Sequence, residues 1–243
     1  VLAVDLDPQA NLSQAFMHER YERFLEDQGA SIVEIFNGYH PPAKSKKSSH
    51  PLDPSAAVVQ VRGSDRLELI PSRFDFSDHL VSSLKPDPKV LARFLSENYL
   101  HKDFVIIDCA PTESVFTRAA YHASGFVLVP VKPEYFATIG FPLLQGSLDQ
   151  FRAENRGQSI DVCGIVINNA FYDGGNDGGP EKYSSLRDIK KEAKSNGWKI
   201  YTNEIPCSRG FPKMMRGDFS YLGNALHYRR FADEFFKSVG LGF

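Results

Sequence analysis

The stretch VLAVDLDPQ, residues 1–9, decides the fold of this chain. Its first four residues form an unbroken apolar run, which is typical of a parallel strand buried on both faces. Asp5 and Asp7 follow where the strand ends, and Pro8 and Gln9 begin the turn into a helix. Because ligands bind at the carboxyl edge of doubly wound sheets, we expect both carboxylates to face a crevice at that edge.

Apolar runs and helical patterns alternate along the rest of the chain. Further candidate strands lie at residues 67–71, 104–107, 126–129 and 162–167. Apolar residues recur at helical spacing over residues 12–26, 88–99, 114–123, 135–154, 182–195 and 224–238. This βαβ alternation predicts one α/β domain over residues 1–243, with a doubly wound, mostly parallel sheet and helices on both faces.

Two segments interrupt the alternation. Residues 39–54 are rich in Pro, Ser and Lys, and residues 172–180 contain two Gly-Gly pairs. Such composition is typical of surface loops. We therefore expect a flexible insertion at 39–54 and a Gly-rich loop at 172–180.

Composition excludes several classes of protein. The formal net charge of -2 gives no global basic field, so any binding to nucleic acid has to come from a local patch. The three cysteines are far apart and form no CxxC pair, which argues against a disulfide framework and a zinc site. No apolar run reaches the roughly 18 residues of a spanning helix. These features favour a reducing, cytoplasmic location.

A third carboxylate ends another candidate strand. Asp108 follows the apolar run at 104–107 and precedes Cys109, Ala110 and Pro111. An apolar strand that ends in Asp has the form of a Walker B element, which holds Mg²⁺ directly or through water. An Asp in such a place is also common as a helix cap or turn residue, so the assignment depends on the wider context.

Five stretches supply that context. They are VDLDPQANLS at 4–13, LIPS at 69–72, DFVIIDCAPT at 103–112, VLVPVKPEYF at 127–136 and GIVIN at 164–168. In this order they resemble the ParA/MinD group of deviant Walker ATPases, and within it the ParA partition ATPases most closely. The resemblance implies a P-loop NTPase-like fold, ATP and Mg²⁺ as cofactors, and a role in plasmid or chromosome segregation.

The resemblance also implies roles for particular residues. Asp7 matches the carboxylate that positions the attacking water, Asp5 matches the acidic residue near the metal, and Asp108 matches the Walker B ligand. Asn168 matches the position that contacts the adenine edge, and Pro206 falls in the loop that flanks the base. These five residues are our candidates for catalysis, metal binding and nucleotide binding.

One departure from the family is large. Members begin with a strand that leads into a loop of the form KGGxGK[ST], whose amides and lysines hold the phosphates. None of the 18 glycines here is followed by Lys, so the chain as given has no such loop and is expected not to hydrolyse ATP by itself. A segment cut before Val1 and a degenerate, inactive relative are the two explanations, and we expect the first, with hydrolysis in the intact protein.

Basic residues suggest a DNA-binding surface. Four of them recur at i, i+3, i+4 and i+7 in the predicted helix at 182–195, and others follow Pro206. Such a stripe can contact DNA phosphates without selecting a sequence, although a solvated helix face would show the same pattern. The candidate DNA-binding residues are Arg187, Lys190, Lys191, Lys194, Lys213 and Arg216.

The family resemblance implies the partners. It predicts an ATP-bound homodimer on nonspecific nucleoid DNA, together with a ParB-like centromere-binding protein. Two alternatives stay open. A MinD-like membrane switch would need an amphipathic C-terminal helix, whereas the phenylalanines of residues 231–243 favour a helix docked on the core and no stable membrane association. A catalytically inactive adaptor would keep the fold and bind no nucleotide.

Overall fold

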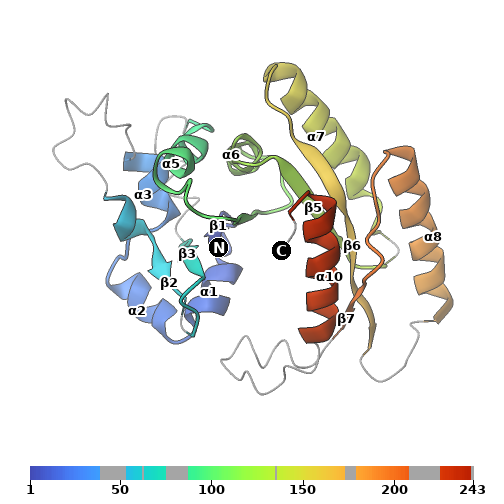
Figure 1. The fold of residues 1–243 in the computed structure, drawn as a ribbon, viewed down its shortest axis with the longest axis horizontal. Coiled ribbons are helices and arrows are strands. Elements are labelled where there is room, and N and C mark those ends of the chain that lie inside the picture. The colour runs from blue at the N-terminus through green and yellow to red at the C-terminus, as the bar shows by residue number, and fades with distance from the viewer. Residues whose placement is uncertain are drawn as a thin grey trace. The chain divides into compact units, whose positions relative to one another are not determined.

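Strand β1 (Leu2–Asp5) lies inside a four-stranded sheet in the computed structural model (Figure 1). The strand order is β2-β3-β1-β4, with β2 (Val59–Gln60), β3 (Glu68–Ile70) and β4 (Val105–Asp108). β1 pairs in parallel with both β3 and β4, and β2 is the antiparallel edge strand. All four residues of β1 are buried, as the apolar run predicts.

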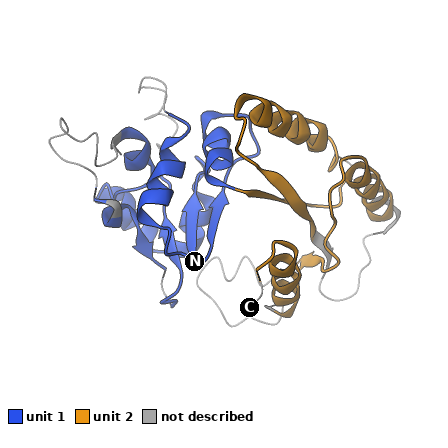
Figure 2. Cartoon of the chain, turned by 45° about the horizontal axis from the view of Figure 1, so that its top comes forward, with its two compact units in different colours: residues 1–124 blue, residues 125–243 orange. Residues whose placement is uncertain are grey.

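The structure describes residues 1–38, 53–61, 63–74, 87–134, 136–172, 179–207 and 225–241. They form two compact units, Val1–Ser124 and Gly125–Phe243 (Figure 2). Most of the expected insertion at 39–54 and most of the expected Gly-rich loop at 172–180 lie outside the described residues. The sheet of β1 to β4 belongs to the first unit.

Helices cover both faces of this first sheet. On one face α3 (Ile32–Gly38), α5 (Val90–Asn98) and α6 (Val115–Ala123) pack against Leu2 and Val4. On the other face α1 (Asn11–Met17) and α2 (Arg20–Glu26) pack against Ala3 and Leu69. The second layer does not cover β4, where Ile106 is 51% exposed. The apolar run at 104–107 suggested a buried strand, but within the described residues one face of β4 is open.

Two local predictions also need correction. The helix predicted over residues 12–26 is two helices, because His18 adopts a left-handed conformation with φ of 50° that ends α1. α3 was not predicted, although a capping box marks its start. The Glu34 carboxylate accepts the Ser31 N–H at 2.6 Å, and the Ser31 hydroxyl accepts the Val33 N–H at 3.2 Å. A short 3-10 helix, η2 (Pro54–Ala57), follows in the chain.

The second unit contains a parallel three-stranded sheet with the order β5-β6-β7. Its strands are β5 (Phe126–Val131), β6 (Asp161–Tyr172) and β7 (Ile205–Cys207). Helices α7 (Gly140–Glu154) and α8 (Gly179–Ser195) lie on one side, and α10 (Ala225–Ser238) lies on the other (Figures 1 and 2). Side chains of β6 alternate between these layers, with Ile165 and Ile167 toward α8 and Val166 toward α10.

A bulge in β6 makes room for a buried tyrosine. The pairing with β5 shifts between Val127 and Leu128, so that Leu128 pairs with Gly164. Gly164 has φ of +153°, and a Cβ there would lie 2.5 Å from the Tyr201 ring. Glycine is therefore required at this position. The Tyr201 hydroxyl in turn donates to the Cys163 carbonyl at 3.1 Å.

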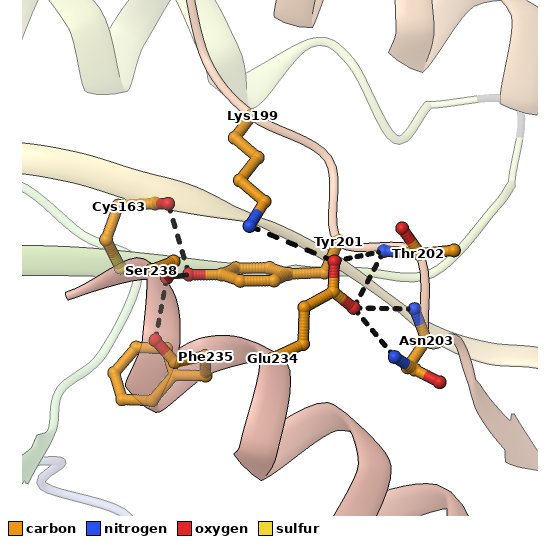
Figure 3. Close-up of polar contacts among 8 residues, drawn as sticks. All are labelled: Cys163, Lys199, Tyr201, Thr202, Asn203, Glu234, Phe235 and Ser238. Carbon is orange, nitrogen blue, oxygen red and sulfur yellow. Dashed lines mark hydrogen bonds and ion pairs between the residues drawn. The ribbon is translucent and has the colours of Figure 1, made fainter. Parts of the chain in front are cut away.

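Polar contacts join α10 to the segment that enters β7 (Figure 3). The Glu234 carboxylate accepts the Thr202 N–H at 2.9 Å, and it accepts both the backbone and side-chain N–H groups of Asn203, at 3.0 and 2.8 Å. Beside this carboxylate, Phe231 and Phe235 pack against Tyr201, which is buried. The helix is thus docked by an apolar face and one charged side chain.

We predict that Glu234→Gln destabilises the protein at pH 7 by about 1–2 kcal/mol, because an amide nitrogen replaces one accepting oxygen. Burial alone would raise the pKa of Glu234, but the hydrogen bonds from Thr202 and Asn203 outweigh it and lower the pKa below its ordinary value. The stabilisation is thus present above the ordinary pKa and is lost as the pH falls through the lowered one. Thermal unfolding at pH 7 and pH 3 measures both effects.

The matched control is Asp233→Asn, an exposed neighbour on the same helix. Its melting temperature should follow that of the wild type at both pH values. Equal melting temperatures for Glu234→Gln and the wild type at pH 7 would contradict a stabilising role for this contact.

Candidate functional site

Two of the three candidate carboxylates end neighbouring strands. In the parallel pairing of β1 with β4, Asp5 stands opposite Asp108. The next amide, Leu6 N–H, donates to the Asp108 carbonyl at 2.7 Å, so the pairing continues to the edge of the sheet. The structure therefore brings together the Asp5 and Asp108 predicted from sequence, with Asp7 in the turn directly after them.

Asp5 is fully buried and faces helix α1. Its Oδ2 accepts the backbone N–H of Ser13 at 2.7 Å and the Ser13 hydroxyl at 2.6 Å, and its Oδ1 accepts the Asp7 N–H at 3.2 Å. Burial raises the pKa of Asp5, and this effect outweighs the hydrogen bonds from Ser13 and Asp7, which lower it. Asp5 is thus the most enclosed of the three carboxylates.

Asp7 is partly exposed in the turn that leads to α1. Its Oδ1 accepts the Gln9 N–H at 2.9 Å, and its carbonyl accepts the Ala10 N–H at 2.9 Å. This is an Asx turn, which holds the carboxylate beside its own backbone. No donor among the described residues contacts the other carboxylate oxygen, which leaves that oxygen available to a ligand or a water molecule.

Asp108 has the freest carboxylate at this edge. The residue is exposed, and no donor in the described parts of the chain contacts its side chain. The surrounding protein atoms displace part of the water around the carboxylate, and this desolvation, with the negative charges of Asp5 and Asp7, raises the pKa of Asp108 to about 6. Close carboxylates that disfavour one another's charge are typical of a cation site.

The donor set fits Mg²⁺. Carboxylate oxygens are hard ligands, and Mg²⁺ is usually held by one or two of them together with water and substrate phosphates. Within the described residues no group of three or more His, Cys, Asp or Glu side chains is arranged to hold a metal ion. A Mg²⁺ ion at this edge would need further oxygen ligands besides these carboxylates.

The thiol next to Asp108 is not a nucleophile. Burial, with the charges of Asp108 and Asp7, raises the pKa of Cys109 to about 11. A thiol with such a pKa is almost fully protonated at neutral pH, and the thiolate is the reactive form. At neutral pH the Cys109 thiol is therefore not in its reactive form.

Sequence reasoning gave no role to Ser13 and Ser72, although each ends one of the stretches that carry the family resemblance. The Ser13 hydroxyl accepts the Ser72 N–H at 2.8 Å while it donates to Asp5. Both serines are fully buried. A buried hydroxyl eight residues after the carboxylate that it contacts has no sequence signal of its own, because the contact depends on where the turn places α1.

The two candidate nucleotide-base residues lie in the second unit. Asn168 was predicted at the end of a strand, but β6 continues to Tyr172, and Asn168 lies where its pairing changes from β5 to Ile205 of β7. Pro206 was predicted in a loop, but it is a buried residue within β7. β7 is the last strand of its sheet, where a residue without an N–H group is tolerated.

The basic stripe of α8 lies on an exposed face. The opposite face carries Ser185, Ile189 and Ala193, which are buried. Within the described residues none of the four basic side chains makes an ion pair. They are Arg187, Lys190, Lys191 and Lys194, and all four are exposed. The other two candidate DNA-binding residues, Lys213 and Arg216, lie outside the described part of the chain.

Known proteins are similar to this chain in sequence. The model of the AAA_31 family, described as an AAA domain, matches residues 1–161. The chain is 28% identical over 151 residues to the sporulation initiation inhibitor protein Soj of Bacillus subtilis, a match that covers 59% of this chain and 51% of Soj. It is 23% identical over 219 residues to the chromosome partitioning protein ParA of Caulobacter vibrioides, with 85% of this chain and 68% of that protein covered.

A third curated relative, an uncharacterized protein of Methanocaldococcus jannaschii, is 26% identical over 172 residues, which are 69% of this chain and 60% of that protein. The chain thus spans about half to two thirds of these relatives.

Solved structures share the fold. The ATP complex of McdA from Cyanothece matches with a TM-score of 0.76 and 18% identity, over 100% of this chain and 85% of that chain. The AMPPNP complex of a putative plasmid partition protein from Borrelia burgdorferi matches with a TM-score of 0.67 and 18% identity, over 97% and 85%.

A third structure is cobyrinic acid a,c-diamide synthase from Mycobacterium smegmatis with an ATP analog and magnesium. It matches with a TM-score of 0.68 and 22% identity, over 96% of this chain and 80% of that chain. These likenesses confirm the α/β fold class predicted from sequence.

We predict that Asp108→Asn raises the melting temperature at pH 8 by a few degrees. The folded pKa of about 6 lies above the ordinary value of 3.8, so the charged carboxylate opposes folding above pH 6, and this penalty is relieved as the pH falls toward 4. The gain should therefore shrink between pH 8 and pH 4 in thermal unfolding. Asp103→Asn, an exposed residue of the same unit, is the control and should change nothing. An increase in melting temperature that is the same at pH 8 and pH 4 would contradict a penalty from the charged Asp108 carboxylate.

Proposed function

The chain belongs to the AAA_31 family of AAA domains, as a member of ParA type, and on that premise we propose that it is the core of an ATP-hydrolysing partition protein. The observation that carries the proposal is the convergence of Asp5 and Asp108 at the ends of β1 and β4, with Asp7 in the next turn. The protein would act in plasmid or chromosome segregation, through a nucleotide-driven homodimer on nonspecific DNA.

Each carboxylate has a separate task in this proposal. Phosphoryl transfer in P-loop enzymes depends on positioning and on charge neutralisation more than on covalent steps. Asp108 supplies the accessible oxygens that hold Mg²⁺, and Asp5 adds negative charge beside it. Asp7 accepts a hydrogen bond from the attacking water and orients it in line with the γ-phosphate. When bound, Mg²⁺ neutralises the oxygens of the β- and γ-phosphates.

The proposal that the protein binds a nucleotide rests on the family resemblance and on the similar solved structures. The similar structures include complexes with ATP, with AMPPNP, and with an ATP analog and magnesium. By resemblance, we assign contact with the adenine edge to Asn168 and the flank of the base to Pro206. The phosphate-binding loop of this family has no counterpart in the sequence, so activity is proposed for the complete gene product.

The DNA assignment rests on the exposed stripe of α8. Its four cations lie on one face and have no ion-pair partners among the described residues. The sequence of the same helix contains three acidic residues, Glu181, Asp188 and Glu192, and the last two weaken the positive potential of the stripe, as they would on a merely solvated face. We propose the DNA-binding role together with nucleoid association and a ParB-like partner.

The docking of α10 disfavours the membrane alternative. Phe231 and Phe235 pack on Val166 and Tyr201, so the apolar face of the helix is used inside the protein. In the described parts of the chain, no helix is both long enough and apolar enough to cross a bilayer. The adaptor alternative is separated from the proposal by nucleotide binding, which an adaptor would lack.

We predict that Asp7→Asn lowers the kcat of ATP hydrolysis by the complete gene product about 100-fold, because the amide nitrogen that replaces one carboxylate oxygen cannot accept the hydrogen bond by which Asp7 orients the attacking water. Asn retains the oxygen that accepts the Gln9 N–H, so the turn should persist. The dissociation constant of a fluorescent ATP analogue should stay unchanged. Asp103→Asn serves as the control. Full activity in Asp7→Asn would refute the role of Asp7, and absence of nucleotide binding in the wild type would favour the adaptor.

A second prediction concerns DNA. Lys190→Glu with Lys194→Glu should weaken binding to a nonspecific duplex at least tenfold, and should reduce the slope of log K against log salt by about 2, since about 0.9 counterions are released per phosphate contact. Electrophoretic mobility shifts across a salt series measure both quantities. The control is Lys89→Glu with Arg156→Glu, an equal charge change at exposed residues on other elements. Equal weakening of DNA binding by both pairs of substitutions would show that only the net charge matters, and would contradict a specific role of the α8 stripe.

A further inference from the structure

Ser13 occupies a buried junction between three segments of the first unit. Its backbone N–H and its hydroxyl both donate to Asp5 Oδ2, at 2.7 and 2.6 Å. Its hydroxyl oxygen also accepts the Ser72 N–H at 2.8 Å. One side chain thus connects the end of β1, the first turns of α1 and the segment that follows β3.

The same contacts define what Asp5 can do. A carboxylate offers about four acceptor positions, and three of those of Asp5 are filled by protein N–H and O–H groups. The residue has no exposed surface. Its carboxylate is therefore engaged with the protein interior, whereas that of Asp108 has no protein donor among the described residues.

The junction extends to α2. The Ser72 carbonyl accepts the Tyr21 hydroxyl at 3.2 Å, and the Tyr21 ring packs edge-on against Phe74 with centroids 5.6 Å apart. Ser72 is fully buried, but its own hydroxyl has no partner within the described residues. The backbone of Ser72, rather than its side chain, is thus the part that joins the junction.

A strained turn lies between Asp5 and Ser13 in the chain. Ala10 adopts a left-handed conformation, with φ of 54°, although it carries a Cβ. Such a conformation costs about 1–3 kcal/mol and persists only where the surroundings impose it. The Asp7 carbonyl bonds the Ala10 N–H, the Ala10 carbonyl accepts the Gln14 N–H at 3.0 Å, and Ala10 is fully buried. The Asp7 turn is therefore held from both sides.

We propose that Ser13 and Asp5 are positioning residues, which clamp the turn of residues 5–10 onto the segment that follows β3 and thereby set where the Asp7 carboxylate stands. The proposal rests on the proposed role of Asp7 in orienting water. Asp5 acts in it through the backbone N–H of Asp7, and Ser13 acts through Asp5 and Ser72. A simple cap of α1 would need only the bond between Ser13 N–H and Asp5, and it would not need the bond to Ser72.

The first test is amide hydrogen exchange of the present chain without nucleotide. Ser13→Ala should speed exchange of residues 5–14 and of the Ser72 amide about tenfold, because a buried charge-assisted bond and the bond to Ser72 are both lost. Ser72→Ala is the matched control, since it keeps the backbone bond and removes a hydroxyl without a partner, and it should leave exchange unchanged. Tyr21→Phe should give a smaller increase in the exchange rates. This variant serves as the test if Ser13→Ala does not fold.

Unchanged exchange over residues 5–14 in both Ser13→Ala and Tyr21→Phe would overturn the clamp. The second test uses the complete gene product. Ser13→Ala should lower kcat for ATP hydrolysis by roughly 10- to 100-fold, and the dissociation constant for an ATP analogue should not change. In the Asp7→Asn background, Ser13→Ala should have no further effect on kcat, because it acts through Asp7.

Additive losses in the double variant would show that Ser13 acts by another route and would overturn the positioning role. If the wild-type gene product does not hydrolyse ATP, the proposed function fails while hydrogen exchange still decides the clamp. If the wild type hydrolyses ATP and Ser13→Ala does so equally well, the positioning role fails and the proposed function stands.

Discussion

The in-register parallel pairing of β1 with β4 is the constraint on which the site depends. It places Asp5 opposite Asp108 and continues through the bond from Leu6 N–H to the Asp108 carbonyl. Desolvation raises the pKa of both carboxyl groups, and the negative charges of Asp5 and Asp7 raise that of Asp108 further. Carboxylates whose charged forms are disfavoured in this way do not stabilise the fold, which is why we attribute the arrangement to function.

The three carboxylates differ because their surroundings differ. Asp5 is enclosed by Ser13 and the Asp7 amide, Asp7 has one oxygen without a donor among the described residues, and Asp108 is exposed. In the proposed function, this gradient from buried to exposed would separate the residue that holds the turn from the residue that holds the metal ion.

The structure could be predicted from the sequence where a pattern repeats within one helix or strand. The apolar run before Asp5 predicted a buried central strand, and the spacing of Lys190 and Lys194 predicted an exposed face, because both depend on the period of a single element. Contacts between segments far apart in the sequence could not be predicted. The bond from Ser72 N–H to the Ser13 hydroxyl spans 59 residues, and the change of partner at Asn168 depends on where β7 arrives. The break at His18 was missed because an apolar period continues across it.

The most direct test of the nucleotide site is a crystal structure of the complete gene product with AMPPNP and Mn²⁺, whose anomalous scattering locates the ion. We expect one ion at the carboxyl edge of β1 and β4, bound to Asp108 directly or through one water, with the γ-phosphate on the side of Asp7. An ion and a nucleotide bound away from this edge, or a protein that takes up neither, would contradict the account.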